Sequence, residues 1–293
     1  MHPWLTEWPQ RILRWRRNWA NRHFSPGTLV NGRYRLIRKL GEGSFGVSYL
    51  CRDETMHEKL CVLKRIHPLR RHKKLRLAIF AEETAILSRL QHPAMPKLYA
   101  TFTHYSYPCM VMEYVPGMSL EQYIFDHGGI FSETAALTTF TQLLELVADL
   151  HAEQIVHRDL RIANIMMRPD SLALIDFGLA RHLQHTTLIP ELDILDTDDP
   201  PEKQLRRALH VSSDFYALGH VLLFMLYSAF PTEHLSQRPA RTWEQELAVL
   251  HADTKKLIRR LLQVDQPYEE IYSIQQDTLA LLRQLTNPAH ATD

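Results

Sequence analysis

The sequence predicts an α+β fold in which strands come first and helices follow. Residues 33–53 alternate apolar and polar side chains around a glycine-rich turn, as in a β-hairpin, and residues 61–64 form another short apolar strand. Apolar residues recur at helical spacing in 80–90, 257–265 and 274–285. Because strands followed by a run of helices are typical of α+β folds, we expect a small antiparallel part and a larger helical part.

Composition narrows the class of protein. The 293 residues suffice for one large or two modest lobes, and the formal net charge of +1 gives no overall attraction to nucleic acid, so we expect no nucleic-acid partner. Cys51, Cys61 and Cys109 are widely spaced in apolar runs, which predicts buried free thiols in a reducing compartment. The apolar run 216–230 is shorter than the ~20 residues of a membrane-spanning helix. We therefore expect a buried helix and a cytoplasmic protein.

Residues 1–24 differ from the rest of the chain. They hold four of the five tryptophans, five arginines and a single acid. Ile12, Trp15 and Trp19 recur at helical spacing, which predicts an amphipathic helix. Its apolar face either packs on the folded domain or a partner, or lies peripherally at a membrane with its arginines on anionic lipid. We expect residues 25–28 to complete this extension as a linker.

Residues 157–178 gather two acids and an amide between apolar, strand-like pieces. Asp159 follows a histidine and an arginine, Asn164 lies five residues later, and Asp176 begins an Asp-Phe-Gly sequence. Asp159 is able to accept a proton from a hydroxyl group. Asn164 and Asp176 offer hard oxygen ligands to a divalent cation such as Mg²⁺, which neutralises phosphate oxygens. The order and spacing of these residues point to phosphate transfer.

A second motif lies in the predicted hairpin, where residues 41–46 read Gly-Glu-Gly-Ser-Phe-Gly. Glycines let the backbone approach an anion without interference from Cβ atoms, so backbone amides are able to cover phosphates. The motif lies between two strands, unlike a Rossmann turn, which precedes a helix. A strand that ends in Lys64 follows, and the predicted helix 80–90 carries Glu82 and Glu83.

From about Tyr34 to about Asp265, these motifs together resemble the eukaryotic-like protein kinase family, and within it bacterial serine/threonine protein kinases. The resemblance implies a bilobal protein kinase-like fold: a small antiparallel β lobe with one main helix (29–115) and a larger, mainly α-helical lobe (116–293). It also implies ATP-dependent transfer of the γ-phosphate to serine or threonine hydroxyls of a protein substrate, with autophosphorylation and with ATP and Mg²⁺ or Mn²⁺ as cofactors.

The resemblance assigns a role to individual residues. Lys64 holds the α- and β-phosphates, and Glu83, or alternatively Glu82, is its ion-pair partner. Asp159 is the catalytic base or the residue that orients the acceptor hydroxyl, with Arg161 beside it. The metal ligands are Asn164 and Asp176. The other nucleotide contacts are the glycine-rich loop, two residues of the roof over the nucleotide, the gatekeeper, two hinge residues, a ribose contact and one further residue: Gly41, Glu42, Gly43, Ser44, Phe45, Gly46, Ser48, Val62, Met112, Glu113, Val115, Ser119 and Met166.

The family pattern extends into the segment after Asp176. Arg158 is expected to pair with a phosphate on this segment, and Asp214 is expected to hold backbone amides of the catalytic loop. The possible phosphate acceptors are Thr186, Thr187 and Thr197.

Several features depart from the pattern. Ser48 and Val62 replace the family's usual valine and alanine in the nucleotide roof. The family's Ala-Pro-Glu sequence is Pro-Pro-Glu here, and Glu269 stands where an arginine partner of Glu202 is expected. Substitute partners are Arg206, Arg207, Arg259 and Arg260. The acidic segment 193–201 favours weak or unusual peptide selection, with a preference for basic sequences.

Two kinds of alternative remain open. Arg161 stands where serine/threonine kinases usually have lysine and resembles some tyrosine kinases, so a tyrosine kinase is an alternative. The unusual segment before Glu202 and the Trp/Arg-rich start of the chain favour a kinase of a small molecule or lipid-linked sugar as another acceptor class. A pseudokinase scaffold is the other, although every residue essential to the chemistry is present.

Overall fold

The computed structural model describes residues 23–43, 46–67, 73–184, 200–230 and 241–286. The chain divides into two units: a small unit, Met1–His92 with Pro96–Tyr114, and a large unit, Pro93–Met95 with Val115–Asp293. The predicted boundary between the lobes lies one residue further on, after Val115.

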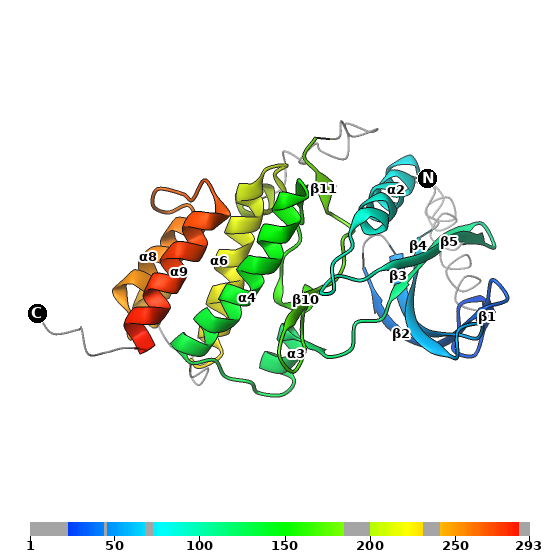
Figure 1. The fold of residues 1–293 in the computed structure, drawn as a ribbon, viewed down its shortest axis with the longest axis horizontal. Helices are drawn as coiled ribbons and strands as arrows, with labels where there is room; N and C mark the ends of the chain where they lie inside the picture. The colour runs from blue at the N-terminus through cyan, green and yellow to red at the C-terminus, as the bar shows by residue number, and fades with distance from the viewer. Residues whose placement is uncertain (1–22, 44–45, 68–72, 185–199, 231–240, 287–293) are drawn as a thin grey trace, which may run out of the picture. The chain divides into compact units, whose positions relative to one another are not determined.

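The small unit is a six-stranded antiparallel sheet with one helix (Figure 1). The strand order is β1-β2-β3-β4-β6-β5. Helix α2 (Lys73–Arg89) packs against β5 and β6. The strand bounds are β1 Leu29–Val30, β2 Tyr34–Glu42, β3 Gly46–Asp53, β4 Lys59–Ile66, β5 Leu98–His104 and β6 Tyr107–Glu113.

One face of this sheet carries an aromatic core around a buried arginine. Arg65, on β4, is 2% exposed, and its guanidinium carbon lies 4.7 Å from the ring centre of Phe24 and 5.0 Å from that of Tyr107. Its Nη2 is 3.4 Å from the hydroxyl of Tyr49. Such enclosure replaces hydration by cation–π attraction.

The expectation that residues 25–28 form a linker is wrong. Phe24 is 2% exposed within the core of the small unit. The amide of Gly27 donates to the carbonyl of Leu36, and the amide of Leu36 donates to the carbonyl of Thr28. The segment is thus a turn held against β2, because the buried Phe24 ring anchors one side of it and the backbone hydrogen bonds with Leu36 anchor the other. Of the predicted helix over residues 1–24, the part up to residue 22 lies outside the described residues.

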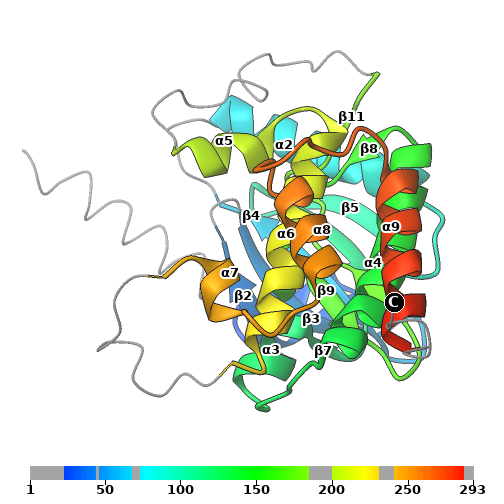
Figure 2. The same ribbon diagram turned by 90° about the vertical axis from the view of Figure 1, so that its left-hand side faces the viewer.

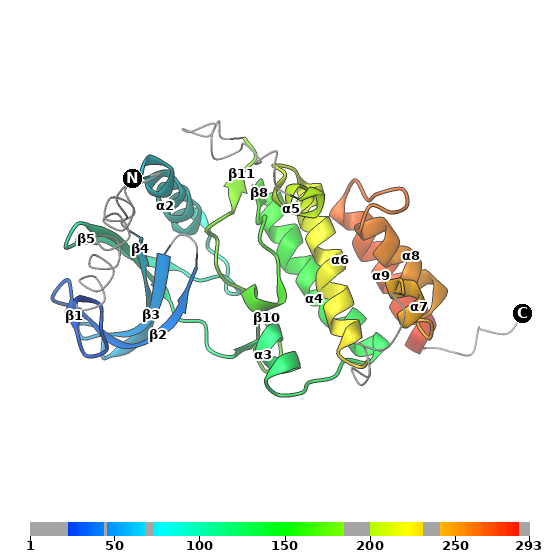
Figure 3. The same cartoon turned by 180° about the vertical axis from the view of Figure 1, so that it is seen from behind.

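The large unit is mainly helical. Figure 2 shows α9 against α4 and α8 against α6, and α6 also packs on α4. The α5 helix adjoins α6 (Figure 3). The helix bounds are α3 Leu120–Phe125, α4 Glu133–Ala152, η1 Ile162–Asn164 (3₁₀), α5 Pro201–Arg207, α6 Val211–Tyr227, α7 Trp243–Glu246, α8 Ala252–Leu261 and α9 Ile271–Thr286.

Helix α6 is the predicted buried helix. Twelve of its 17 residues are buried, and Gly219 allows α8 to approach so closely that an added Cβ would lie 3.0 Å from Leu261. Within the residues that the structure describes, no single helix has the length and apolar character needed to span a membrane.

Short strands hold the connections between helices in the large unit. One sheet has the order β10-β9-β7 and another pairs β11 with β8. Their bounds are β7 Met118–Ser119, β8 Ile155–Val156, β9 Ile165–Met167, β10 Leu172–Leu174 and β11 Arg181–His182. Because β8 and β9 flank residues 157–164, both ends of that loop are fixed.

Candidate active site

Lys64 and Glu83 form a buried ion pair in the small unit. Nζ of Lys64, on β4, lies 2.6 Å from Oε1 of Glu83, on α2, and the two residues are 9% and 1% exposed. Glu83 faces inward because it lies one helical turn from the buried Ile79 and Leu87. Glu82 is half-buried. Of the two glutamates that the sequence offers, the structure therefore pairs Glu83 with Lys64.

Strand register places the predicted roof residues on the same sheet face as Lys64. Ser48 lies opposite Lys64 in the β3–β4 ladder, and Val62 lies opposite Met112 in the β4–β6 ladder. Directly opposed residues project from one face, as do residues two apart on one strand. Ser48, Val62 and Met112 thus share a face with the lysine.

The three glycines of the hairpin differ in what surrounds them. A Cβ on Gly46 would lie 2.4 Å from the carbonyl oxygen of Arg65, so glycine allows β3 to approach β4. Gly41 and Gly43 face open space, where an approaching group would meet backbone alone. Glu42 pairs with Lys39 at 2.5 Å.

Two predicted residues of this loop, Ser44 and Phe45, lie outside the described residues. Contacts of the whole loop with phosphates therefore stay a prediction.

The predicted hinge residues lie on either side of Tyr114, the last residue of the small unit. The Glu113 amide donates to the carbonyl of Lys97 at 2.8 Å, and a Glu113 carboxylate oxygen accepts from the Lys97 amide at 3.3 Å. Val115 is 5% exposed, and among the described residues its amide has no backbone hydrogen bond. Their contacts with adenine stay a prediction.

Ser119 serves as a helix cap. Its hydroxyl accepts from the Gln122 amide at 3.1 Å, and the Gln122 side chain accepts from the Ser119 amide at 3.0 Å, which closes a capping box on α3. Met166, 9% exposed, is its strand partner. Gly117 has φ 127°, and a Cβ there would meet the Met167 carbonyl oxygen at 2.3 Å, so this turn requires glycine. The predicted ribose contact of Ser119 stays a prediction.

Asp159 is held by Asn164 in the large unit. Nδ2 of Asn164 donates to the backbone oxygen and to Oδ2 of Asp159, both at 3.0 Å. Burial raises the pKa of the Asp159 carboxyl, and the charge of Asp176 adds to the rise, against the lowering effect of His157 and Arg161. Asp159 is therefore a stronger proton acceptor than an exposed carboxylate.

Asp214, at the start of α6, fixes the backbone that leads into Asp159. It is fully buried; Oδ1 accepts from the Arg158 amide at 2.8 Å, and Oδ2 accepts from the His157 amide at 2.9 Å. Oδ2 also lies 2.9 Å from Nε2 of His151. The prediction that Asp214 holds catalytic-loop amides is confirmed.

The backbone of the loop adopts two unusual conformations. Arg158 has φ 62° and Asp176 has φ 63°, which side chains other than glycine rarely adopt. Such conformations persist only where surrounding contacts enforce them, and the bonds from Asp214 supply such contacts at Arg158.

Asn164 and Asp176 fit the predicted role of cation ligands. The Ile175 amide donates to the Asn164 carbonyl at 2.9 Å, so the chain reaches Asp176 directly beside Asn164. Because the Asn164 nitrogen bonds to Asp159, its side-chain oxygen is the atom available to a cation. Mg²⁺ is usually held by one or two carboxylates together with phosphate oxygens and water, so two protein ligands suffice.

Arg158 is tied to α5. Its Nε donates to the Arg207 carbonyl oxygen at 2.8 Å, and its Nη2 donates to the same atom. The expected phosphate acceptors for Arg158, namely Thr186, Thr187 and Thr197, lie outside the described residues. A phosphate contact of Arg158 stays a prediction.

Two of the four arginines suggested as partners of Glu202 are engaged elsewhere. Arg259 pairs with Asp265 at 2.8 Å and with Glu244 at 2.9 Å, while Arg260 pairs with Asp277 at 2.7 Å. Glu269, the acid expected to face Glu202, is exposed, as is Glu202. For residues 200–230 and 241–286, the structure gives no ion pair to Glu202.

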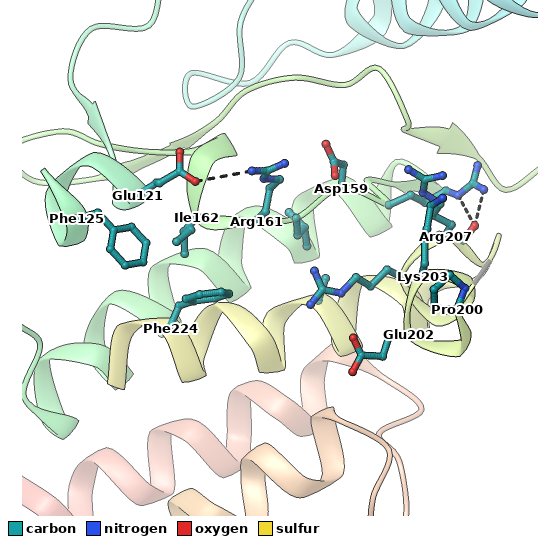
Figure 4. Close-up of a pocket in the computed structure, with 14 residues that line it drawn as sticks. Glu121, Phe125, Asp159, Arg161, Ile162, Pro200, Glu202, Lys203, Arg207 and Phe224 are labelled. Atoms are coloured by element: carbon teal, nitrogen blue, oxygen red, sulfur yellow. Dashed lines mark hydrogen bonds and ion pairs between the residues drawn. The ribbon is translucent and has the colours of Figure 1, made fainter. Parts of the chain in front are cut away.

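A cavity of about 520 Å³ lies beside Asp159, within the large unit (Figure 4). Arg161 lines it and pairs with Glu121 at 3.7 Å. The acidic residues of its lining are Glu121, Asp159 and Glu202. The cationic residues are Arg158, Arg161, Lys203, Arg206 and Arg207. This excess of cations does not support the expected preference for basic peptides.

Sequence reasoning missed the apolar part of this lining, formed by Phe125, Ile162 and Phe224 among others. Phe224 gave no signal because the helix around it is apolar on every side, so an exposed ring looks like a buried one. Phe125 ends the short α3, where periodicity is too brief to define a face.

Comparison with known proteins agrees with this geometry. A family model described as a protein kinase domain matches residues 34–292. The probable serine/threonine-protein kinase YbdM of Bacillus subtilis is 30% identical over 266 residues, which are 91% of this chain and 96% of that protein. Serine/threonine-protein kinase C of Synechocystis is 31% identical over 71% of this chain, but the match spans only 41% of that protein.

Solved structures show the same fold. The kinase domain of Mycobacterium tuberculosis PknI is 20% identical, with a TM-score of 0.63 over 87% of this chain and 98% of that one. A second structure of that domain gives a TM-score of 0.64 at 18% identity, over 90% and 99%. The predicted fold class, a small antiparallel β lobe and a mainly helical lobe, is confirmed. On the family match, the fold and the arrangement around Asp159, this chain belongs to the protein kinase domain family.

Proposed function

We propose that the chain is an ATP-dependent serine/threonine protein kinase that phosphorylates protein substrates and itself, with Mg²⁺ or Mn²⁺ as the accompanying cation. The observation that carries this proposal is the setting of Asp159. Asn164 orients its carboxylate, Asp214 holds the two preceding amides, and the group lines a cavity able to admit a substrate. The likeness to relatives named serine/threonine kinases supports the choice of acceptor.

In this proposal the protein positions groups and offsets charge. Asp159 aligns the acceptor hydroxyl and accepts its proton, a role that its raised pKa favours. Lys64, steered by Glu83, offsets charge on the nucleotide phosphates. Asn164 and Asp176 hold the divalent cation, which when bound neutralises phosphate oxygens.

Phosphate transfer from labelled ATP tests the proposal. With Mg²⁺, the wild-type chain should incorporate label into phosphoserine or phosphothreonine, both in itself and in an added protein such as casein. Asp159→Ala should lower the rate by about 10²- to 10³-fold, because the aligned acceptor is lost. ATP and Mg²⁺ should still raise the melting temperature of the Asp159→Ala variant. Lys64→Met should lose both the rate and that stabilisation.

The outcomes separate the alternatives. Label found only on tyrosine would favour a tyrosine kinase. Label found only on a small molecule would favour a kinase of a small molecule or lipid-linked sugar. Equal rates for wild type and Asp159→Ala would contradict the assigned role. A pseudokinase scaffold predicts no transfer in any arm.

We also propose that the chain is cytoplasmic and that residues 1–24 contact a membrane surface or a partner protein. The Trp/Arg composition of the segment supports this. Co-sedimentation with anionic liposomes tests the membrane contact. Full-length protein should pellet and a chain lacking residues 1–22 should stay in solution, whereas equal pelleting would contradict it.

A further inference from the structure

The cavity beside Asp159 has an apolar end. Figure 4 shows the rings of Phe125 and Phe224 on either side of Ile162, at the end of the cavity away from Lys203 and Arg207. Phe125 is 64% exposed and Phe224 is 44% exposed. Large rings gathered on an exposed concave surface are typical of a binding site, because covering them removes apolar area from water.

One residue of the apolar end, Ile162, belongs to the same loop as Asp159. Ile162 lies three residues after Asp159, and both line the cavity. An extended peptide advances about 3.3 Å per residue. A peptide whose hydroxyl reaches Asp159 therefore places a side chain only a few positions away over the two rings.

The charges near the apolar end give a basic side chain little to bind. Glu121 is the acid closest to it in Figure 4, and its carboxylate already pairs with Arg161 at 3.7 Å. The full lining carries more cationic than acidic side chains. An arginine or lysine on a substrate would thus enter a region that is cationic or apolar.

We infer that the protein substrates carry a bulky apolar side chain within about three residues of the phosphorylated serine or threonine, seated against Phe125 and Phe224. This inference rests on the proposed kinase function and names its substrate class. The two phenylalanines are specificity-determining residues, and the apolar side chain replaces the basic determinant that the sequence led us to expect.

A positional peptide array tests the inference. Each peptide has a central serine or threonine, and positions up to three residues on either side are varied one at a time. Wild-type protein should select Leu, Ile, Met or Phe at one of these positions. Phe224→Glu should lower kcat/KM for the selected peptide by about 10- to 100-fold, because the apolar side chain loses its partner. The same variant should accept Arg or Lys better at that position.

Three further variants complete the test. Phe224→Leu keeps the apolar surface and should keep the preference. Phe125→Glu, on a different helix, should reproduce the loss and serves if Phe224→Glu does not fold, as judged by thermal unfolding. Tyr272→Ser removes a 63% exposed ring that does not line the cavity, and it should behave as wild type.

Labelling of casein and of the chain itself separates failure of the apolar preference from failure of the proposed kinase function. If wild type labels these proteins but shows no apolar preference, or if both glutamate variants keep the preference, the inference is overturned and the proposed function stands. If wild type labels nothing, the proposed function and this inference fail together.

Discussion

Replacing Asp214 by asparagine should damage the catalytic loop although residue 214 lies on a helix outside it. The Asp214 carboxylate accepts three hydrogen bonds through two oxygens. Asparagine has a single side-chain oxygen and puts an NH₂ group in place of the other. In one orientation of the asparagine, its NH₂ group faces the Arg158 amide. In the other, it faces the His157 amide and His151, so in either case a donor meets a donor.

The structure sets the size of the effect. Losing one charge-assisted hydrogen bond and leaving a buried N–H unpaired costs about 3 kcal/mol. A domain is typically stable by about 5–15 kcal/mol, so the change is easily measured, and Asp214→Ala, which removes all three bonds, should fail to fold. Displacement of Asp159 by ~1 Å should lower kcat by about 10²-fold.

Urea unfolding followed by circular dichroism, hydrogen exchange of residues 155–160 and kcat together provide the assay. Asp214→Asn should unfold at lower urea, and its loop amides should exchange faster. Ser213→Ala is the matched control, because Ser213 is also fully buried on α6 and its hydroxyl donates to the His210 carbonyl, not to the loop of Asp159 as far as the structure describes it. That change should cost about 1 kcal/mol. An unfolding midpoint equal to that of the control, with kcat within about twofold of wild type, would refute the reasoning.

Three further predictions concern other parts of the structure. Burial raises the pKa of Asp159, so the folded state loses stability as pH rises and this carboxyl ionises. Asp159→Asn, which cannot ionise, should therefore melt at or above the wild-type temperature at pH 8, and the difference should shrink toward pH 4. A variant that melts below wild type at pH 8 would contradict this. The methyl group of Gly46→Ala would meet the β4 backbone at 2.4 Å, so this change should lower the free energy of unfolding by about 1–3 kcal/mol. Residue 43 faces open space, so Gly43→Ala should leave the melting temperature almost unchanged. Equal melting curves for the two variants would count against the close approach of β3 to β4. Burial raises the pKa of Cys109 to about 12, so iodoacetamide at pH 8 should label it only after unfolding, as measured by peptide mass; rapid labelling of the native chain would be the opposite result.

Features that depend on local spacing could be predicted from the sequence. The resemblance favours Glu83 over Glu82 as the partner of Lys64, and the structure pairs Glu83 with it. The helical period alone leaves both open, because each glutamate lies three or four residues from an apolar residue of α2. Asp159 and Asn164 lie on one short loop between strands and therefore close together, and with Asp176 after the next two strands they indicated the chemistry. Resemblance to the kinase family added the distant Asp214.

Features that depend on distant contacts could not be predicted. The pairing of Arg259 with Asp265 is set by how the end of α8 folds back, which no local pattern encodes. Phe24 precedes a Ser-Pro-Gly sequence typical of a linker, and only the sheet beneath it shows that its ring is buried. Exposure of Phe224 likewise depends on which helices leave its side of α6 uncovered.

The enclosed guanidinium of Arg65 bears on where this protein is truncated for crystallisation. The family match begins at residue 34, yet the ring that covers one side of this cation belongs to Phe24. A shortened chain that starts at the family boundary would expose the cation to solvent and remove a partner of the β4 strand that carries Lys64. Kinase preparations from this chain should therefore retain Phe24 if phosphate binding is to be measured on an intact lobe.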